Sequence, residues 1–377
     1  RVLFRSPVRQ LARLERGSLR ATLPSGRTIE IRGRTPGPVG EIRVRSWRFF
    51  RRLVTRGDVG VGEAYMAGEW ESEDATALLE LFAVNLDTIG EQTMASGLAE
   101  RLLAVQHFLN RNTRTGARRN IAAHYDLGNA FYESWLDPTM TYSSAYFGRG
   151  ANDLEAAQRD KYRRLAESTG IRPGERILEI GCGWGGFAEY AAGELGCRVT
   201  GLTLSAEQKA YAEERLRRRG LDDRVEWDWI VSMEVFGAGG ERYWPTFFRT
   251  VRERLAPHGR AGLQIITLRD DLFESYRKSA DFIQKYIFPG GMLPPMDRLG
   301  TVVEGEGLAT RAVEGFGRDY ARTLAEWRER FLAAWPQMPA MGFDERFRRM
   351  WLFYLHFCEA GFRAGTIDVK HVVLERA

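Results

Sequence analysis

The stretch R-I-L-E-I-G-C-G-W-G-G-F-A-E-Y-A-A, from Arg176 to Ala192, decides the fold of this chain. A short apolar run comes first, four glycines follow within positions 181 to 186, and a helical pattern completes it. The order predicts a strand, a tight turn and a helix. Glycines adopt backbone angles closed to other residues and let a ligand lie against the main chain. The stretch therefore predicts a site for a nucleotide-like cofactor.

The glycine spacing also satisfies G-x-G-x-x-G, which is typical of nicotinamide and flavin sites but weak by itself. A dinucleotide site needs an acidic residue about twenty positions further on, to hold the ribose. The next strand pattern ends in Thr-Leu-Ser, and no carboxylate follows until Glu207. Glu179 instead gives E-x-G-x-G, and its carboxylate suits the ammonium and sulfonium of S-adenosylmethionine. These residues favour a methyltransferase over a nicotinamide enzyme.

Strand and helix patterns alternate after residue 170, which is typical of a doubly wound α/β sheet. The predicted strands are 176–180, 198–203, 224–227, 229–235 and 260–267, and the predicted helices between them are 187–194, 205–219 and 243–255. Parallel strands need a crossover of about a dozen residues. Trp227 and Asp228 join two predicted strands directly, so we expect residues to be missing from the chain at that point.

The chain before this region reads as a smaller α+β domain. We expect residues 1–110 to form an N-terminal lipid- or membrane-associated domain and residues 111–377 to form the methyltransferase domain with a lipid pocket. The expected elements outside the alternating region are a hairpin within 18–34, a break at 35–38, a glycine-rich loop at 57–68, and helices at 7–17, 75–86, 98–110, 154–169, 323–335 and 343–362.

The net charge of +5 hides a strongly basic N-terminal end, because residues 1–60 carry fifteen Arg against four Asp or Glu. Aromatic side chains such as Trp47 and Phe49 lie among these arginines, which favours an anionic membrane surface. An ordinary solvated basic face is an equal alternative. No apolar run reaches the roughly 20 residues that span a bilayer, and no signal peptide is visible. We expect a cytoplasmic protein, peripheral at the inner face of the membrane. The three cysteines show no metal-ligand spacing.

Five motifs together resemble the cyclopropane fatty acid synthase family. They are H-Y-D-L-G-N at 124–129, T-Y-S-S-A-Y-F at 141–147, E-I-G-C-G-W-G-G at 179–186, G-L-T-L-S-A-E-Q at 201–208 and K-Y-I-F-P-G-G at 285–291. The resemblance runs from about residue 40 to the end. It implies a class I methyltransferase domain that uses S-adenosylmethionine to act on double bonds in phospholipid acyl chains.

The resemblance also implies the residues that bind the cofactor. Matched position by position, they are Tyr142, Ser143, Glu179, Gly181, Gly183, Trp184, Gly185, Thr203, Leu204 and Gln208. The family's acidic contact to adenine would fall in the gap near Trp227. An alkene that attacks a sulfonium methyl leaves a carbocation, so water must be excluded. Aromatic faces hold a cation without reacting, which is a task for Tyr125, Tyr142, Tyr286 or Tyr320. Aromatic residues between 331 and 362 would line an acyl pocket or a core.

Cyclopropane formation also removes a proton from the new methyl group, and the family resembled here does so with a bound bicarbonate. This sequence differs from the family at the residues that hold the bicarbonate. Ser144 replaces a cysteine, Gly237 replaces a glutamate, and Gln264 replaces a histidine, while Tyr320 and the backbone at Ile266 are kept. We therefore expect catalysis to involve Tyr320, Gln264, Gly237 and Ser144 without a well-held bicarbonate. Cys358 stands where the family has a cysteine to which catalysis has been ascribed, and a buried structural role fits this mechanism better.

These departures favour a different resolution of the cation, in which a hydride shifts and a proton then leaves the methyl group to give an exocyclic methylene. That outcome resembles the family's methylene-forming branch, which with a separate flavin- or NADPH-dependent reductase leads to mid-chain methyl-branched acids. A working cyclopropane synthase is the alternative. Assembly as a homodimer is a further expectation. A lipid-binding accessory module and a nucleic-acid methyltransferase are less favoured, because the glycine turn is intact and no base-reading motif accompanies the arginines. We expect no nucleic acid as a partner and no metal.

Overall fold

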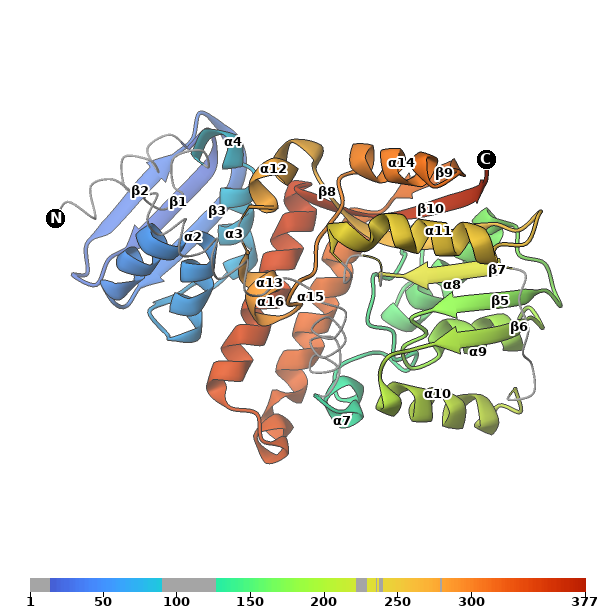
Figure 1. Cartoon of the computed structure of the whole chain (residues 1–377). Coiled ribbons are helices and arrows are strands. Elements are labelled where there is room, and N and C mark those ends of the chain that lie inside the picture. The colour runs from blue at the N-terminus through green and yellow to red at the C-terminus, as the bar shows by residue number, and fades with distance from the viewer. Residues whose placement is uncertain (1–13, 90–126, 222–228, 235, 237–239, 279) are drawn as a thin grey trace. The chain divides into compact units, whose positions relative to one another are not determined.

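A computed structural model of the chain describes residues 14–89, 127–221, 229–234, 236, 240–278 and 280–377 (Figure 1). The chain forms two compact units. The first comprises 1–111, 274–287 and 335–366, and the second comprises 112–273, 288–334 and 367–377. Two segments from the C-terminal half thus belong to the first unit, although the sequence places them in one continuous methyltransferase part.

The first unit contains a four-stranded sheet with the order β2-β1-β3-β4. β1 (Arg16–Thr22) and β2 (Thr28–Arg32) form the predicted antiparallel hairpin. β3 (Thr35–Val44) pairs in parallel with β1, and β4 (Trp70–Glu71) adds to its other edge. The predicted break at 35–38 is wrong, because β3 begins there. Its two prolines are tolerated because the register shifts between Arg16 and Ser18 of β1, where the ladder is already irregular.

Helices complete the first unit. α2 (Arg48–Met66) runs through the segment predicted as a glycine-rich loop and is kinked at Gly57, which has φ 54° and ψ −133°. α3 (Ala75–Ala83) begins at Asp74, whose side chain accepts a hydrogen bond from Ala77 N at 2.9 Å. The remaining helices of this unit are α4 (Leu86–Ile89), α13 (Phe282–Tyr286), η5 (Trp335–Met341) and α16 (Glu345–Ala364).

Aromatic side chains of α16 build the core of this first unit rather than an open channel. The ring of Phe353 lies 4.5 Å from that of Phe282 and 6.4 Å from that of Trp70, measured between centroids. Trp351 stacks on Phe347 at 5.7 Å. Trp351 and Phe353 are both 1% exposed. The sequence analysis left two roles open for the aromatic residues between 331 and 362, an acyl pocket or a core. Of these, Trp351 and Phe353 belong to a core.

The second unit contains a six-stranded sheet with the order β6-β5-β7-β8-β10-β9. β5 (Arg176–Ile180), β6 (Arg198–Leu202), β7 (Trp229–Met233) and β8 (Ala261–Leu268) are parallel, as Figure 1 shows. β10 (Ile367–Arg376) pairs antiparallel with β8 and β9 (Leu308–Gly315). The alternating pattern predicted the four parallel strands but not the last two. The fold is the expected doubly wound α/β sheet.

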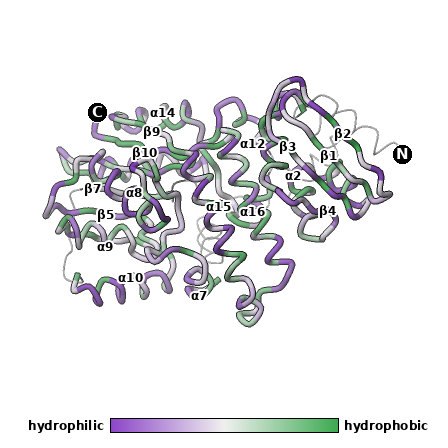
Figure 2. The backbone as a smooth tube through the Cα atoms, turned by 180° about the vertical axis from the view of Figure 1, so that it is seen from behind, coloured by the Kyte–Doolittle hydropathy of each residue, from purple (hydrophilic) through white to green (hydrophobic). Residues whose placement is uncertain are grey.

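Helices connect and cover these strands. In the described residues they are α7 (Asn129–Glu133), α8 (Leu154–Thr169), α9 (Gly186–Gly193), α10 (Ala206–Arg218), η3 (Glu241–Tyr243), α11 (Trp244–Arg254), η4 (Asp270–Leu272), α14 (Met296–Gly305) and α15 (Gly317–Ala334). The short helix α12 (Phe273–Tyr276) begins with the last residue of this stretch of the second unit, and its other residues belong to the first. In Figure 2 α10 is largely purple, as its charged sequence requires. A buried cluster that includes Tyr162, Ile177 and Phe187 joins α8, β5 and α9. The glycine turn between β5 and α9 is thereby fixed in the sheet.

Several expectations fall outside the described residues. These are the helices at 7–17 (largely) and 98–110, the strand at 224–227 with the expected gap at Trp227 and Asp228, and the positions Tyr125 and Gly237. Within the described part of the chain, no helix has the length and hydropathy that crossing a bilayer requires. The same residues contain no group of three or more His, Cys, Asp or Glu that would hold a metal ion.

Candidate functional site: a cofactor turn beside a held carboxylate

The glycine turn leaves the carboxyl end of β5, in the middle of the parallel strands. Gly181, Gly183 and Gly185 have φ values of 83°, 51° and 80°, which lie in the left-handed region that favours glycine. A Cβ placed on Gly183 would meet no atom within 4 Å. The main chain therefore faces open space at this glycine. Ligands of open α/β sheets bind outside the carboxyl ends of the strands, where this turn lies.

Glu179 is the acidic residue that ends the strand before this turn. Its side chain is buried, and among the residues that the structure describes its Oε2 has no hydrogen-bond partner. Burial raises the pKa of Glu179 to about 8. A buried carboxylate with an unused oxygen is poised to receive a cationic ligand. This fits the ammonium or sulfonium of S-adenosylmethionine.

The indole of Trp184, inside the turn, is held by an aromatic wall. Trp184 Nε1 donates a 2.8 Å hydrogen bond to Asn129 Oδ1, and its ring lies 4.8 Å from that of Tyr132. Tyr142 continues this wall, 5.4 Å from Tyr132 and 5.2 Å from Trp327 between ring centroids. The structure thus brings two of the predicted cofactor residues, Trp184 and Tyr142, to one aromatic cluster.

The end of β6 presents the next predicted cofactor residues. Thr203 Oγ1 donates to Gln208 Oε1 at 3.0 Å, and Ser205 caps α10 through Gln208 N. Leu204 is 55% exposed, although it is a large apolar residue. An exposed leucine beside an ordered polar turn is suited to contact a flat apolar surface such as adenine.

Ser143 marks the border between this cofactor side and a second polar cluster. Its Oγ accepts a 2.7 Å hydrogen bond from Lys161 Nζ, and its carbonyl accepts one from Gln158 at 2.9 Å. An ammonium group can only donate, so the hydroxyl hydrogen of Ser143 remains available to a ligand. The next residue, Ser144, turns the chain into the second cluster.

The second cluster surrounds the carboxylate of Glu234, which the sequence analysis overlooked. Glu234 Oε1 accepts from Ser144 N at 3.0 Å and from Gln264 Nε2 at 2.7 Å, and Oε2 accepts from Tyr320 OH at 2.7 Å. Three of the residues predicted to surround a bicarbonate therefore surround a side-chain carboxylate. The sequence analysis noted that Gly237 replaces the family's glutamate, and the structure shows that Glu234, at a different position, places a carboxylate among these residues.

The position of Glu234 explains both its orientation and why it was missed. It directly follows β7, and its N–H donates to Gln264 O at 2.8 Å. Its φ is 57°, a conformation that costs about 1–3 kcal/mol for a residue with a Cβ and that often marks a functional site. The available sequence signal was its place at the carboxyl end of a central parallel strand.

His371 of β10 fixes the orientation of Gln264 from the other side. His371 and Gln264 are register partners, and His371 Nε2 lies 3.0 Å from Gln264 Oε1. Burial holds the pKa of His371 well below its usual value, so the ring is neutral. The carbonyl of Gln264 thus faces His371, and its amide nitrogen faces Glu234.

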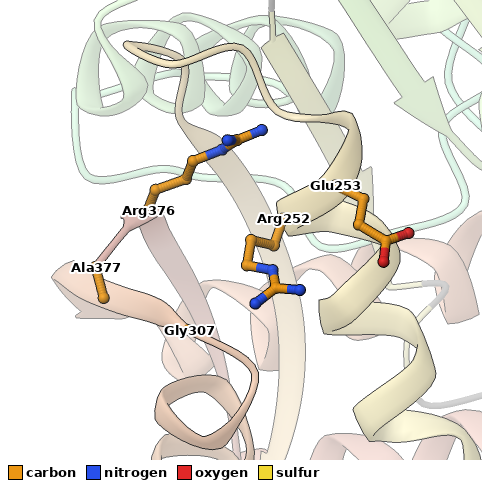
Figure 3. A pocket seen from close by; sticks show the side chains of 5 residues that line it. All are labelled: Arg252, Glu253, Gly307, Arg376 and Ala377. Atoms are coloured by element: carbon orange, nitrogen blue, oxygen red, sulfur yellow. The ribbon is translucent and has the colours of Figure 1, made fainter.

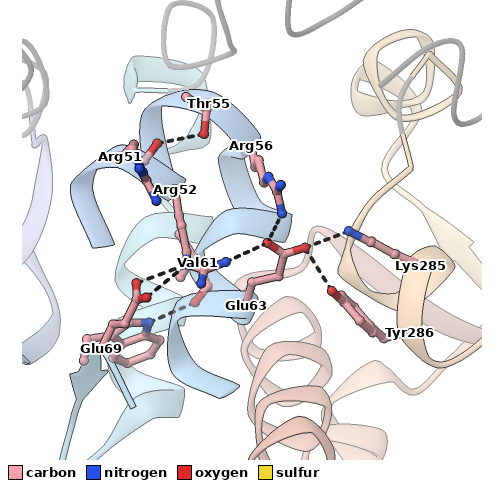
Figure 4. A network of polar contacts seen from close by, with 10 residues as sticks. Arg51, Arg52, Thr55, Arg56, Val61, Glu63, Glu69, Lys285 and Tyr286 are labelled. Atoms are coloured by element: carbon pink, nitrogen blue, oxygen red, sulfur yellow. Dashed lines mark hydrogen bonds and ion pairs between the residues drawn. The ribbon is translucent and has the colours of Figure 1, made fainter. Parts of the chain in front are cut away.

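Two other candidates, Cys358 and Tyr286, belong to the first unit. Cys358 belongs to α16 and is partly exposed. Tyr286 donates to Glu63 Oε1 at 2.9 Å, beside Lys285 (Figure 4). Figure 4 also shows arginines of α2 around the same carboxylate: Arg56 donates to Glu63 Oε2 at 2.5 Å. Part of the basic N-terminal region therefore forms internal ion pairs.

A separate hollow of about 550 Å³ lies near the C-terminus. It is lined by Arg252, Glu253, Gly307, Arg376 and Ala377 (Figure 3). None of its residues belongs to the predicted site, and no aromatic side chain lines it. It therefore does not suit an acyl chain.

Comparisons with known proteins show the family to which this chain belongs. A family model described as mycolic acid cyclopropane synthetase matches residues 112–372. The tuberculostearic acid methyltransferase UfaA1 of Mycobacterium tuberculosis is 37% identical over 347 residues, 86% of this chain and 81% of that protein. The cyclopropane-fatty-acyl-phospholipid synthase of Escherichia coli is 36% identical over 370 residues, 92% of this chain and 90% of that protein.

A solved structure agrees as well. The mycolic acid cyclopropane synthase CmaA1, complexed with SAH and CTAB, has a TM-score of 0.63 and 29% identity, and the match covers 69% of this chain and 98% of that one. The described fold is accordingly that of class I methyltransferases. The chain belongs to the mycolic acid cyclopropane synthetase family and is an S-adenosylmethionine-dependent enzyme of that family.

Proposed function

We propose that this enzyme transfers a one-carbon unit from S-adenosylmethionine to the double bond of an unsaturated phospholipid acyl chain. The product we propose is a methylene-branched chain, of the 10-methylene-stearoyl type, which a separate flavin- or NADPH-dependent reductase would convert to the methyl-branched acid. A cyclopropane product is the alternative. The names of the two relatives support lipid chemistry but do not choose between these products, since their identities of 37% and 36% are nearly equal.

The observation that carries this proposal is the carboxylate of Glu234, held by Ser144, Gln264 and Tyr320. Both lone pairs of Oε1 are engaged by donors, while Oε2 accepts, among the residues that the structure describes, only the Tyr320 hydroxyl. One lone pair of Oε2 therefore remains for a proton. The side chain of Glu234 is partly buried. We assign Glu234 Oε2 as the base that takes the proton from the added methyl group.

The chemistry balances with this single base. When bound, S-adenosylmethionine supplies an electrophilic methyl group, and the alkene's electron pair takes it to leave a cation on the acyl chain. A hydride then moves from the methylated carbon to its neighbour, which places the cation on the methylated carbon. Glu234 removes a proton from the methyl group. The electron pair of that C–H bond becomes the double bond between the methylated chain carbon and the former methyl carbon. Without the hydride shift, the same proton loss closes a three-membered ring.

The choice between products then depends on timing. Withdrawal from water raises the pKa of Glu234, and the hydrogen bonds that its ionised form accepts from Tyr320, Ser144 and Gln264 limit that rise and so limit its strength as a base. A slower proton removal lengthens the life of the cation and gives the hydride time to move. The aromatic wall of Tyr142 and Trp327 would shield that cation from water. These features favour the methylene product.

The test is a product assay. The enzyme is incubated with dioleoyl phospholipid vesicles and S-adenosylmethionine, and the acyl chains are released and analysed by mass spectrometry with NMR of the olefinic region. A methylene product is expected, and a saturated ring defeats this choice. Glu234→Gln keeps the shape but removes the base, so the product should fall by about a hundredfold or more, while S-adenosylmethionine binding remains. Full activity of Glu234→Gln would reject Glu234 as the base.

We also propose that the enzyme works as a cytoplasmic, peripheral protein on anionic membranes and as a homodimer. Arg48 and Arg51 of α2 are exposed beside Trp47, which is 52% exposed. Such a surface suits lipid headgroups. Arg48→Glu combined with Arg51→Glu should weaken binding to anionic vesicles, and Arg217→Glu combined with Arg218→Glu on α10 is the control with the same charge change. If the variant on α2 and the control on α10 weaken vesicle binding equally, the effect comes from the change in net charge and not from a specific lipid-binding surface. Gel filtration with light scattering tests the dimer.

A further inference from the structure

Lys161 is a lysine that the established chemistry does not use, yet it lies at the centre of the second unit. It belongs to α8, and its side chain is 0% exposed. A lysine is rarely buried without a paired carboxylate. Among the residues that the structure describes, no carboxylate lies within ion-pair distance of Lys161 Nζ, and its hydrogen bond goes to Ser143 Oγ at 2.7 Å. Burying an ammonium group whose hydrogen-bond partner is a neutral hydroxyl costs free energy, so a functional role would explain why this lysine is there.

Three buried or partly buried carboxylates act on Lys161 from different elements. Glu234 follows β7, Asp137 follows α7, and Glu179 ends β5, and each of them favours the charged ammonium. His371 of β10 is neutral and Tyr320 of α15 is a phenol, so neither adds charge near Glu234. Lys161 is thus the cation that acts on Glu234 from the described surroundings.

A short chain of contacts connects Lys161 to Glu234. Lys161 bonds to the side chain of Ser143, and the backbone N–H of the next residue, Ser144, bonds to Glu234 Oε1. The same two serines thereby connect the ammonium on one side to the carboxylate on the other. Ser143 is also a predicted cofactor residue, so the contact spans both halves of the site.

We propose that Lys161 is a positioning residue that keeps Glu234 ionised, and so able to accept the proton, by supplying a buried positive charge through the Ser143–Ser144 turn. This inference rests on the proposed role of Glu234 as the base. Loss of the Lys161 charge leaves the carboxylate with neutral donors only, and partial burial then favours its protonated form. A protonated Glu234 cannot take a proton from the methyl group.

Electrostatic influence between the two groups is reciprocal. Lys161 lowers the pKa of Glu234 against the rise caused by withdrawal from water. Burial lowers the pKa of Lys161 to about 7, and Glu234 is the first of the charges that oppose this fall. Lys161 is therefore sensitive to pH in the range where the enzyme would work, and its charge is most complete below neutrality.

The experiment compares Lys161→Met with Lys161→Arg. Methionine matches the length of the buried stem without charge, and arginine keeps the charge. Product formation is followed in a single turnover from pH 5.5 to 9 with saturating S-adenosylmethionine, and cofactor binding is measured separately by calorimetry. Lys161→Met should move the acidic limb of the profile upward by about one pH unit and lower the rate near neutrality about tenfold. Lys161→Arg should keep the wild-type limb.

The outcomes distinguish this inference from the function on which it rests. Suppose that Glu234→Gln is inactive but Lys161→Met has the same acidic limb of the pH–rate profile as the wild type. The proposed role of Lys161 is then overturned, while the assignment of Glu234 as the base stands. If Glu234→Gln is fully active, the base assignment fails first. A purely structural lysine would lower the melting temperature of Lys161→Met and leave the profile in place, which also overturns the inference. If Lys161→Met does not fold, Lys161→Gln is assayed by the same criterion.

Discussion

Tyr320 of α15 donates its hydroxyl hydrogen to Glu234 Oε2 over 2.7 Å, although 86 positions separate the two residues in the chain. The phenol is buried and its partner is partly buried, so the bond is sheltered from water. It is the only contact that Oε2 makes among the described residues. Tyr320 therefore controls both the direction and the basicity of the oxygen that we assign as the proton acceptor.

Replacing Tyr320 with Phe removes this donor and keeps the ring. A hydrogen bond to an ionised group contributes about 1.5–3 kcal/mol, which corresponds to roughly one to two pKa units. The donor favours ionised Glu234, so its loss raises the pKa of that group further. We expect a rate at pH 7 that is about tenfold to a hundredfold lower and that recovers as the pH rises. A pH profile of product formation measures this.

Tyr243→Phe is the matched control, because Tyr243 lies in η3 with Arg242 over its ring and is not part of the cluster. Its profile should stay unchanged. A Tyr320→Phe variant with the wild-type acidic limb would show that the phenol does not hold Glu234 in solution.

The sequence could predict the cofactor side of this site because its determinants are local. Gly181 to Gly185 follow a strand and precede a helix within a few residues, so the turn chemistry alone places them. The Glu234 cluster could not be predicted in the same way. Its members come from four distant segments, and a register between β8 and β10 brings His371 to Gln264. Only the tertiary pairing determines which carboxylate fills the site.

Two errors in the first unit have an equally physical cause. Prolines at 36 and 38 predicted a break, but β3 tolerates them where its register with β1 shifts. Glycines between 57 and 68 predicted a loop, but α2 continues there because large side chains require close packing. A Cβ on Gly62 would lie 2.2 Å from Phe282 Cδ2 and 2.8 Å from Phe353 Cε1. Gly62 is therefore required by tertiary contacts and does not mark a flexible loop.

That close contact gives a stability prediction. Gly62→Ala must displace two aromatic rings in the core of the first unit, which typically costs about 1–3 kcal/mol. Gly300→Ala is the control, because a Cβ at Gly300 in α14 meets nothing within 4 Å. Alanine there should stabilise by about 0.5–1 kcal/mol. Urea unfolding followed by circular dichroism measures both, and a neutral Gly62→Ala would contradict the packing.

The buried carboxylate of Glu179, whose Oε2 has no hydrogen-bond partner in the described part of the chain, gives a prediction about cofactor binding and pH. Burial raises the pKa of Glu179 to about 8, so in the free protein this group is mostly neutral at pH 7. A bound cation favours the ionised form, and binding should therefore release a proton. We expect the affinity for S-adenosylmethionine to rise with pH, by up to about tenfold per pH unit, until it levels off near pH 8.

Calorimetry in buffers with different ionisation enthalpies measures the released proton directly. Lys161, with a pKa lowered to about 7, loses its own charge over the same range, which helps a cationic ligand in the same direction. Glu179→Gln separates the two, because the amide cannot ionise but keeps the shape of the side chain. This variant should bind more weakly at pH 8 and show a flatter dependence on pH. If binding heats do not depend on the buffer, Glu179 is already ionised in the free enzyme, and its buried oxygen must have another partner.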